Sequence, residues 1–256
     1  MLIGRVAKTS STSKAKASPR KGGKTAPRKT PRRSWRARLR RRILQLCLLV
    51  LLIPVILIAL FAVIPPPTTP YIVSEGVRLG SVERRWVPME EIAPVMARSA
   101  VAAEDANFCL HWGLDLTAIQ EALDEGGARG ASTISQQTVK NVYLWHGRSW
   151  ARKALEALLT PAVEAVWSKR RILEVYLNMA EFDEGVFGVE AAAQHYFGVS
   201  AAQLSAVQAA RLAAILPNPK GRSAARPSEF VRRRAAGIVD GAATIRADGR
   251  AACFED

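Results

Sequence analysis

The chain has 256 residues, enough for one sizeable domain and an appendage. Its formal net charge of +15 would suit a nucleic-acid-binding protein if that charge were spread over a folded domain. Residues 1–42 contain 16 Lys or Arg and no Asp or Glu, which leaves a net charge of −1 for residues 43–256. A folded domain that binds nucleic acid is therefore disfavoured, and we expect no nucleic-acid partner.

The basic residues precede a long apolar run. Residues 1–42 are rich in Ser, Lys, Arg and Pro, which predicts a disordered tail. Residues 43–64 are apolar except for Gln45 and Cys47, and as a helix they span about 33 Å, enough to cross a bilayer core of roughly 30 Å. A buried soluble helix would need a polar face, and a cleaved signal peptide would have a shorter apolar run. We therefore predict one transmembrane helix, with a cytoplasmic tail before it and an extracytoplasmic domain after it.

The folded domain is predicted at residues 71–256. Four prolines within 65–70 indicate a stiff extended spacer, and from Pro88 onward apolar residues recur at helical spacing. Ser132, Ser149 and Ser200 are expected to cap three helices, and Pro161 is expected to kink one. The predicted elements are a strand within 71–87, best at 84–87, and helices over 88–104, 115–126, 132–143, 149–167, 169–179, 189–196, 201–216 and 228–243. The soluble part is thus predicted to be mostly α.

The three cysteines, Cys47, Cys109 and Cys253, form no CxxC pair, and the histidines are scattered, so no zinc-ligand spacing exists. A disulfide between Cys109 and Cys253 requires an extracytoplasmic domain. The sequence alone does not show that the two meet, so this pairing stays open.

Chemistry-bearing residues gather between 104 and 156. Glu104 ends a predicted helix near the apolar Phe108, where burial would raise its pKa and suit it to act as a general base. The alternative is a solvated acid at a helix end. Asp105 points elsewhere on that helix and is a candidate for orienting the loop.

The predicted helix after Ser132 carries amides and a cation. Gln136 and Lys140 are four residues apart and share a face, and Ser132 leaves backbone N–H groups free at the helix start. Together with the neighbouring Gln137, these groups would cradle an anion. The alternative is an ordinary exposed helix with a solvated lysine.

A second cationic group follows. Arg148, Arg152 and Glu156 are spaced by four residues, and Arg148 and Lys153 are suited to hold phosphate. Glu156 would pair with a cation or help to bind a divalent metal. The alternative is a set of surface ion pairs worth a few tenths of a kcal/mol each.

The order and spacing of these residues resemble the five signatures of the peptidoglycan glycosyltransferases (family 51). The matching runs are Glu104-Asp105-x-x-Phe108-x-x-His111-x-Gly113-x-Asp115, Gly130-x-Ser132-Thr133-Ile134-x-Gln136-Gln137-x-x-Lys140-Asn141, Arg152-Lys153-x-x-Glu156, Lys169-x-x-Ile172-Leu173-Glu174-x-Tyr176-Leu177-Asn178 and Arg211-Leu212-Ala213-Ala214-Ile215-Leu216-Pro217-Asn218-Pro219. The segment 144–150 is similar to the monofunctional branch, and a chain that ends at 256 leaves no room for a transpeptidase domain.

The resemblance implies a lysozyme-like, all-α glycosyltransferase domain in the bacterial inner membrane, with a membrane-dipping jaw near residues 112–135. It implies polymerisation of lipid II by transfer of the growing chain onto its 4-hydroxyl, with inversion and release of undecaprenyl diphosphate. Glu104 would be the base and Glu156 would organise the cations or a divalent metal (Mg or Mn). The residues implied to hold substrate are Asp105, Ser132, Gln136, Gln137, Lys140, Arg148, Arg152 and Lys153.

Two other functions compete with the polymerase. A hydrolase on the same scaffold would cut glycan strands, but it would not need the cations at Lys140, Arg148 and Lys153. A non-catalytic assembly partner of other cell-wall synthesis or division proteins would not need Glu104 and Glu156. We therefore expect the polymerase, with lipid II, the membrane and other cell-wall proteins as its partners.

Overall fold

A computed structural model of the chain describes residues 35–124, 132–147 and 149–255. The chain divides into two compact units, Met1–Leu46 and Cys47–Asp256, which are treated separately here. Helix α1 (Trp35–Phe61) begins in the first unit and ends in the second. Of the helices in the described ranges, none combines the length and apolarity that a bilayer crossing requires. The predicted anchor at 43–64 stays a prediction, and residues 1–34 of the basic tail lie outside the described ranges.

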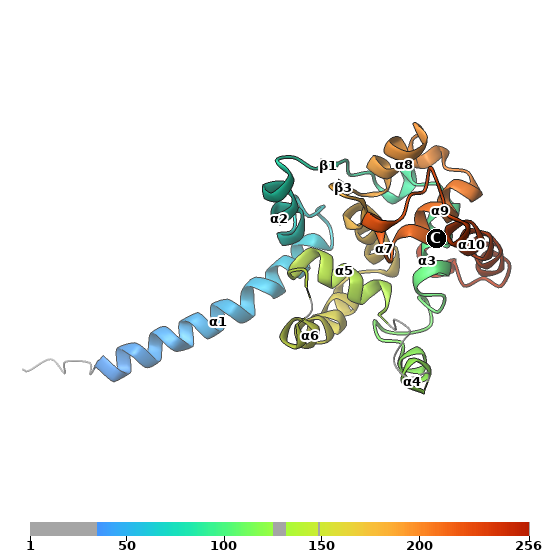
Figure 1. The fold of residues 1–256 in the computed structure, drawn as a ribbon. Helices are drawn as coiled ribbons and strands as arrows, with labels where there is room; N and C mark the ends of the chain where they lie inside the picture. Colours follow the sequence, from blue (N-terminus) through green and yellow to red (C-terminus); the bar gives the residue numbers. More distant parts are fainter. Residues whose placement is uncertain (1–34, 125–131, 148, 256) are drawn as a thin grey trace, which may run out of the picture. The chain divides into compact units, whose positions relative to one another are not determined.

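The second unit is rich in helix, as the sequence predicts, and contains one small sheet (Figure 1). Its elements are α2 (Pro70–Leu79), β1 (Glu83–Arg84), α3 (Pro94–Glu104), α4 (Leu116–Asp124), α5 (Ile134–Tyr143), α6 (Trp150–Val166), α7 (Lys169–Met179), β2 (Glu181–Asp183), β3 (Val186–Phe187), α8 (Val189–Phe197), α9 (Ala206–Ile215), α10 (Glu229–Ala247) and α11 (Ala252–Glu255). The sheet order is β1-β3-β2, with β3 parallel to β1 and antiparallel to β2. Short 3₁₀ turns occupy Met89–Glu91, Ala201–Gln203 and Pro219–Gly221.

Several predicted bounds need correction. Most of the predicted strand region 71–87 is helix α2, because the Thr69 side chain caps it and Pro70 fits the first turn; only β1 is strand. The cap of α5 is Thr133, one residue after the predicted Ser132. The predicted helix over 201–216 is split, and α9 starts at its own capping box on Ser205. The strands β2 and β3 were not predicted.

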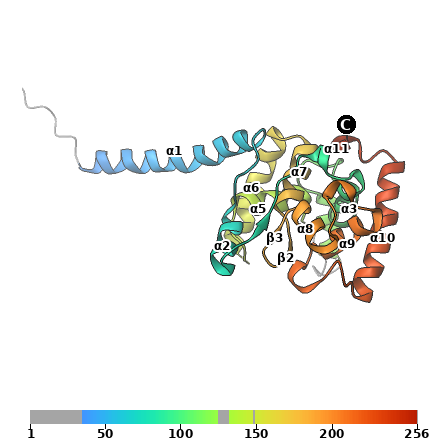
Figure 2. The same cartoon turned by 90° about the horizontal axis from the view of Figure 1, so that it is seen from above.

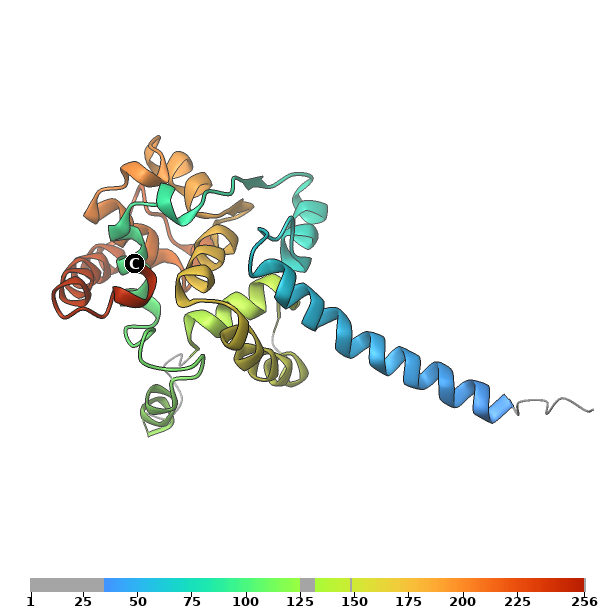
Figure 3. The ribbon, with the colours of Figure 1, turned by 180° about the vertical axis from the view of Figure 1, so that it is seen from behind.

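Helices α3, α9 and α10 form one packed group, and α5, α6 and α7 form another (Figures 1 and 3). Figure 2 shows α10 at one edge of the unit. Small side chains explain the close packing of the first group, because Ala97 and Ala100 of α3 and Ala209 and Ala213 of α9 are almost fully buried. This packing fixes the last turn of α3, where Glu104 lies.

The turn before α8 requires a glycine at position 188. Gly188 has a φ of +85°, and a Cβ there would lie 2.9 Å from the backbone oxygen of Asn178. This turn brings β3 and α8 back against the end of α7.

A disulfide joins Cys109 to Cys253, with their Cα atoms 5.7 Å apart, and this decides the pairing that the sequence left open. The two cysteines are 144 residues apart in sequence, which is why sequence reasoning did not pair them. The bond ties α11 to the loop that follows α3.

We expect reduction of this disulfide to lower the free energy of unfolding by about 3 kcal/mol, because a long closed loop restricts the unfolded chain. Chemical denaturation with and without dithiothreitol measures the difference. A double variant with Cys109→Ser and Cys253→Ser is the control, since its stability should not respond to the reductant. Equal stability of the wild-type protein in both conditions would contradict the prediction.

Candidate active site

Glu104 is the last residue of α3, and its side chain is 11% exposed. Its Oε2 accepts a hydrogen bond of 2.9 Å from Gln137 Nε2, whereas its buried Oε1 accepts none from the described residues. Burial raises the pKa of Glu104, and the Gln137 bond together with the charges of Arg234, Lys140 and Arg222 works in the opposite direction. The carboxylate thus has one oxygen held in place and one oxygen able to take a proton.

Helix α5 begins beside this carboxylate. The Thr133 side chain accepts from the backbone of Gln136, and the Gln136 side chain accepts from the Thr133 backbone at 3.1 Å. Gln136 is only 4% exposed, so its amide serves the capping box. The adjacent Gln137 instead donates a hydrogen bond to Glu104.

Lys140 lies one turn further along α5 and lines a pocket of about 290 Å³ together with Gln137, Asn141, His146 and Tyr176. No described residue forms a hydrogen bond or ion pair with its ammonium group. Burial lowers the pKa of Lys140, and the carboxylates of Glu156 and Glu104 oppose that shift. Lys140 is therefore a half-buried cation within electrostatic reach of both predicted catalytic glutamates.

Glu156 on α6 is 2% exposed and engages two cations. Arg152 Nη1 lies 2.6 Å from Oε2, and Lys153 Nζ lies 2.5 Å from Oε1. Lys153 Nζ also donates to Ser132 Oγ at 2.9 Å, which links α6 to the start of α5. The sequence-predicted cation Arg148 lies outside the described residues.

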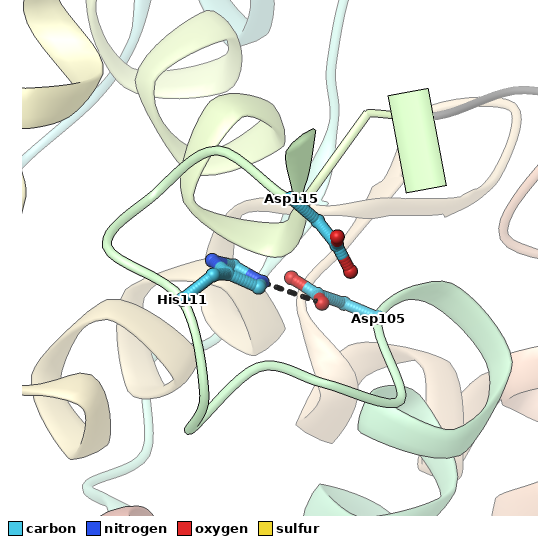
Figure 4. A group of neighbouring side chains, drawn as sticks. All are labelled: Asp105, His111 and Asp115. Atoms are coloured by element: carbon cyan, nitrogen blue, oxygen red, sulfur yellow. Dashed lines mark hydrogen bonds and ion pairs between the residues drawn. The ribbon is translucent and has the colours of Figure 1, made fainter. Parts of the chain in front are cut away.

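Asp105 is buried, and Figure 4 shows its carboxylate next to His111 and Asp115. Its Oδ2 accepts from the Ile134 N–H at 3.0 Å, and its Oδ1 lies 2.8 Å from His111 Nε2. Asp115 faces the same group, and it accepts from the Ala118 N–H and from Asn107. Asp105 thus holds the start of α5 next to Glu104.

Asp105, His111 and Asp115 place one potential ligand atom each within 4.8 Å of one another (Figure 4). Each oxygen of the two carboxylates already accepts a hydrogen bond. These bonds give the three residues a structural role in the loop after α3, and we assign no metal to them. Glu156, the other candidate for a metal, has both oxygens paired with cations.

Most of the predicted site residues lie in two connected groups. Glu104 and Gln137 form the first, and Ser132, Arg152, Lys153 and Glu156 form the second, with Lys140 between them. The residues predicted for the site did not include Arg222 or Arg234. The sequence signal for Arg234 is its position beside the helix face that carries the buried Val231, Ala235 and Ile238.

Comparison with known proteins defines the class. The family described as transglycosylase matches residues 73–243, and the chain belongs to this family. A biosynthetic peptidoglycan transglycosylase of Jannaschia sp. (strain CCS1) is 68% identical over 197 residues, which cover 77% of this chain and 82% of the relative. Proteins of the same name from Caulobacter vibrioides (strain ATCC 19089 / CIP 103742 / CB 15) and Rhizobium meliloti (strain 1021) are 48% and 46% identical. They match over 84% and 88% of this chain, and over 96% of each relative. The family expected from the sequence is confirmed.

Proposed function

We propose that this chain is a peptidoglycan glycosyltransferase that polymerises glycan strands from lipid II for cell-wall synthesis. Its family and the printed names of its relatives support the reaction class. The choice of substrate is based on Lys140, a half-buried ammonium group without a partner among the described residues. It lies between the free Oε1 of Glu104 and the cations that pair with Glu156. A diphosphate next to a hydroxyl nucleophile fits this arrangement.

Glu104 acts as the general base. The 4-hydroxyl of the incoming lipid II gives its proton to Oε1, and its oxygen forms a bond to C1 of the growing chain. The bond from C1 to the undecaprenyl diphosphate breaks, and the electron pair leaves with the diphosphate. Attack opposite to the leaving group inverts the configuration at C1. Burial and the fixed Oε2 favour proton transfer to Oε1.

The cations stabilise the departing diphosphate. Lys140 and Lys153 contact phosphate oxygens, and Glu156 holds Arg152 and Lys153 in position. Arg148 is assigned to the same group from its residue type and spacing and from the resemblance. Because both oxygens of Glu156 are paired, we give it this ordering role; binding of Mg or Mn at Glu156 stays a sequence prediction.

The remaining predicted residues shape the same site. Ser132 and Gln137 present polar groups that can hold sugar or phosphate oxygens, and each also binds one of the charged residues. Gln136 and Asp105 are buried, so they act on the substrate by fixing the start of α5.

We also propose that residues 43–64 anchor the enzyme in the bacterial inner membrane, with residues 1–42 in the cytoplasm. Exposed apolar side chains along α1, including Ile43, Leu46 and Ile56, support the anchor. The Cys109–Cys253 disulfide supports an oxidising compartment for the domain.

Washing membranes with alkaline carbonate tests the anchor. The full chain is expected to stay in the membrane pellet, and a variant lacking residues 1–64 is expected to be released. Recovery of the full chain in the soluble fraction would contradict the anchor.

Turnover of labelled lipid II by the detergent-solubilised full chain tests the reaction. The products are separated by size before and after muramidase digestion. A ladder of long strands supports the polymerase, whereas hydrolysis of preformed strands without polymerisation would favour the lytic alternative. Binding of lipid II without any turnover would favour the assembly partner.

A further inference from the structure

A guanidinium group from the C-terminal part of the chain reaches Glu104. Arg234 of α10 places Nη2 3.9 Å from Glu104 Oε1, and the same Nη2 donates to the Ala103 carbonyl at 3.2 Å. We propose that Arg234 is a positioning residue that keeps Glu104 ionised and oriented for proton transfer. This inference rests on the proposed role of Glu104 as the base.

The contact follows from the way α10 packs on α3. The buried face of α10 carries Val231, Ala235 and Ile238, and Arg234 lies beside this face. A Cβ at Gly241 would lie 3.2 Å from the Ala102 side chain, so the two helices lie close together near the last turn of α3. Arg234 is therefore held at the end of the helix that carries the base.

The neighbouring arginines do not share this contact. Arg233 pairs with Glu229 at 3.2 Å, and both side chains are at least 70% exposed. Arg232 donates to the Pro227 carbonyl at 2.8 Å. Of the three consecutive arginines, Arg234 alone faces Glu104 in the described structure.

The distance between Arg234 Nη2 and Glu104 Oε1 suits a general base better than a directly hydrogen-bonded ion pair would. At 3.9 Å the guanidinium attracts the carboxylate without forming a hydrogen bond to Oε1. The lone pairs of Oε1 stay free to accept the proton of a substrate hydroxyl, while Gln137 holds Oε2. Arg234 Nε is also buried and forms no hydrogen bond with any described residue.

Several groups besides Arg234 act on Glu104. Gln137 and Lys140 face it from α5, and Arg222 acts from the segment before α10. Tyr176 of α7 is close enough for Glu104 and Asp105 to raise its pKa, after the larger effect of burial. Burial raises the pKa of Glu104 and the three cations lower it, so loss of Arg234 should raise it further.

The test compares Arg234→Gln, Arg234→Lys and the matched control Arg233→Gln. Polymerisation of labelled lipid II is measured from about pH 5 to pH 9 as kcat and kcat/KM, with thermal unfolding as a check on folding. The base must be deprotonated to act, so activity rises with pH through the pKa of Glu104.

We expect Arg234→Gln to lower kcat about tenfold near pH 7 and to move the acid limb of the profile upward by about one pH unit, with partial recovery at high pH. Arg234→Lys should restore most of the wild-type limb, and Arg233→Gln should leave the profile unchanged.

An unchanged acid limb would overturn the inference, whether Arg234→Gln lost activity equally at every pH or lost none. If Arg234→Gln does not fold, the Arg234→Lys profile decides: a wild-type limb supports the inference, and a limb displaced as far as one pH unit overturns it. Absence of polymerisation by the folded wild-type chain would instead reject the proposed function.

Discussion

Replacement of Glu104 by Gln is expected to lower polymerisation by about 10²–10⁴-fold, the usual contribution of a general base. The amide has nearly the same shape and is still able to bond to Gln137, but it cannot take the hydroxyl proton. Binding of lipid II should therefore change little while kcat falls. Steady-state turnover together with a direct binding measurement separates the two quantities.

Glu91→Gln is the matched control, since Glu91 is an exposed glutamate in the turn before α3, away from the site. It should leave turnover and its pH dependence unchanged. A Glu104→Gln enzyme with near wild-type kcat would show that another group takes the proton.

Replacement of Glu156 by Gln is expected to have two separate effects. It removes the carboxylate that pairs with Arg152 and Lys153, so the free energy of unfolding should fall by roughly 3 kcal/mol. The cations then lose their common anchor, and kcat should fall by about 10²-fold because the diphosphate is no longer stabilised in a fixed geometry. Denaturant unfolding and turnover per folded molecule measure the two effects.

Glu229→Gln is the matched control for Glu156→Gln. Glu229 also pairs with an arginine on the same helix, but both side chains are exposed, so its loss should cost less than about 1 kcal/mol and leave turnover intact. If Glu156→Gln lowered stability without lowering turnover per folded molecule, its carboxylate would serve the fold alone.

The central helices were predicted well because residues close to their ends, such as capping serines, mark where they begin and end. Ser149 caps α6 as predicted, and α7 has the predicted bounds. A short strand was predicted within 71–87 and is present as β1, one residue before the favoured position, but helix α2 was missed because the Thr69 cap and Pro70 were read as part of the spacer. The strands β2 and β3 have three and two residues, too few for an alternating pattern to be recognised.

The sequence offered candidate residues for the site but not the contacts between them. Glu104, Lys140 and Glu156 were proposed from residue type, spacing and the family resemblance, and the structure brings their charges within reach of one another. The Arg234 contact and the Cys109–Cys253 disulfide span more than a hundred residues, and local patterns carry no information on such pairs. The inward turn of Gln136 depends on a cap that lies one residue from its predicted position.

A crystal structure of the enzyme with a non-reactive lipid II analogue would test the central claim most directly. The account predicts the diphosphate next to Lys140 and Lys153, and an acceptor hydroxyl oxygen about 3 Å from Glu104 Oε1. A diphosphate bound away from these cations, or an acceptor hydroxyl held by another base, would contradict it.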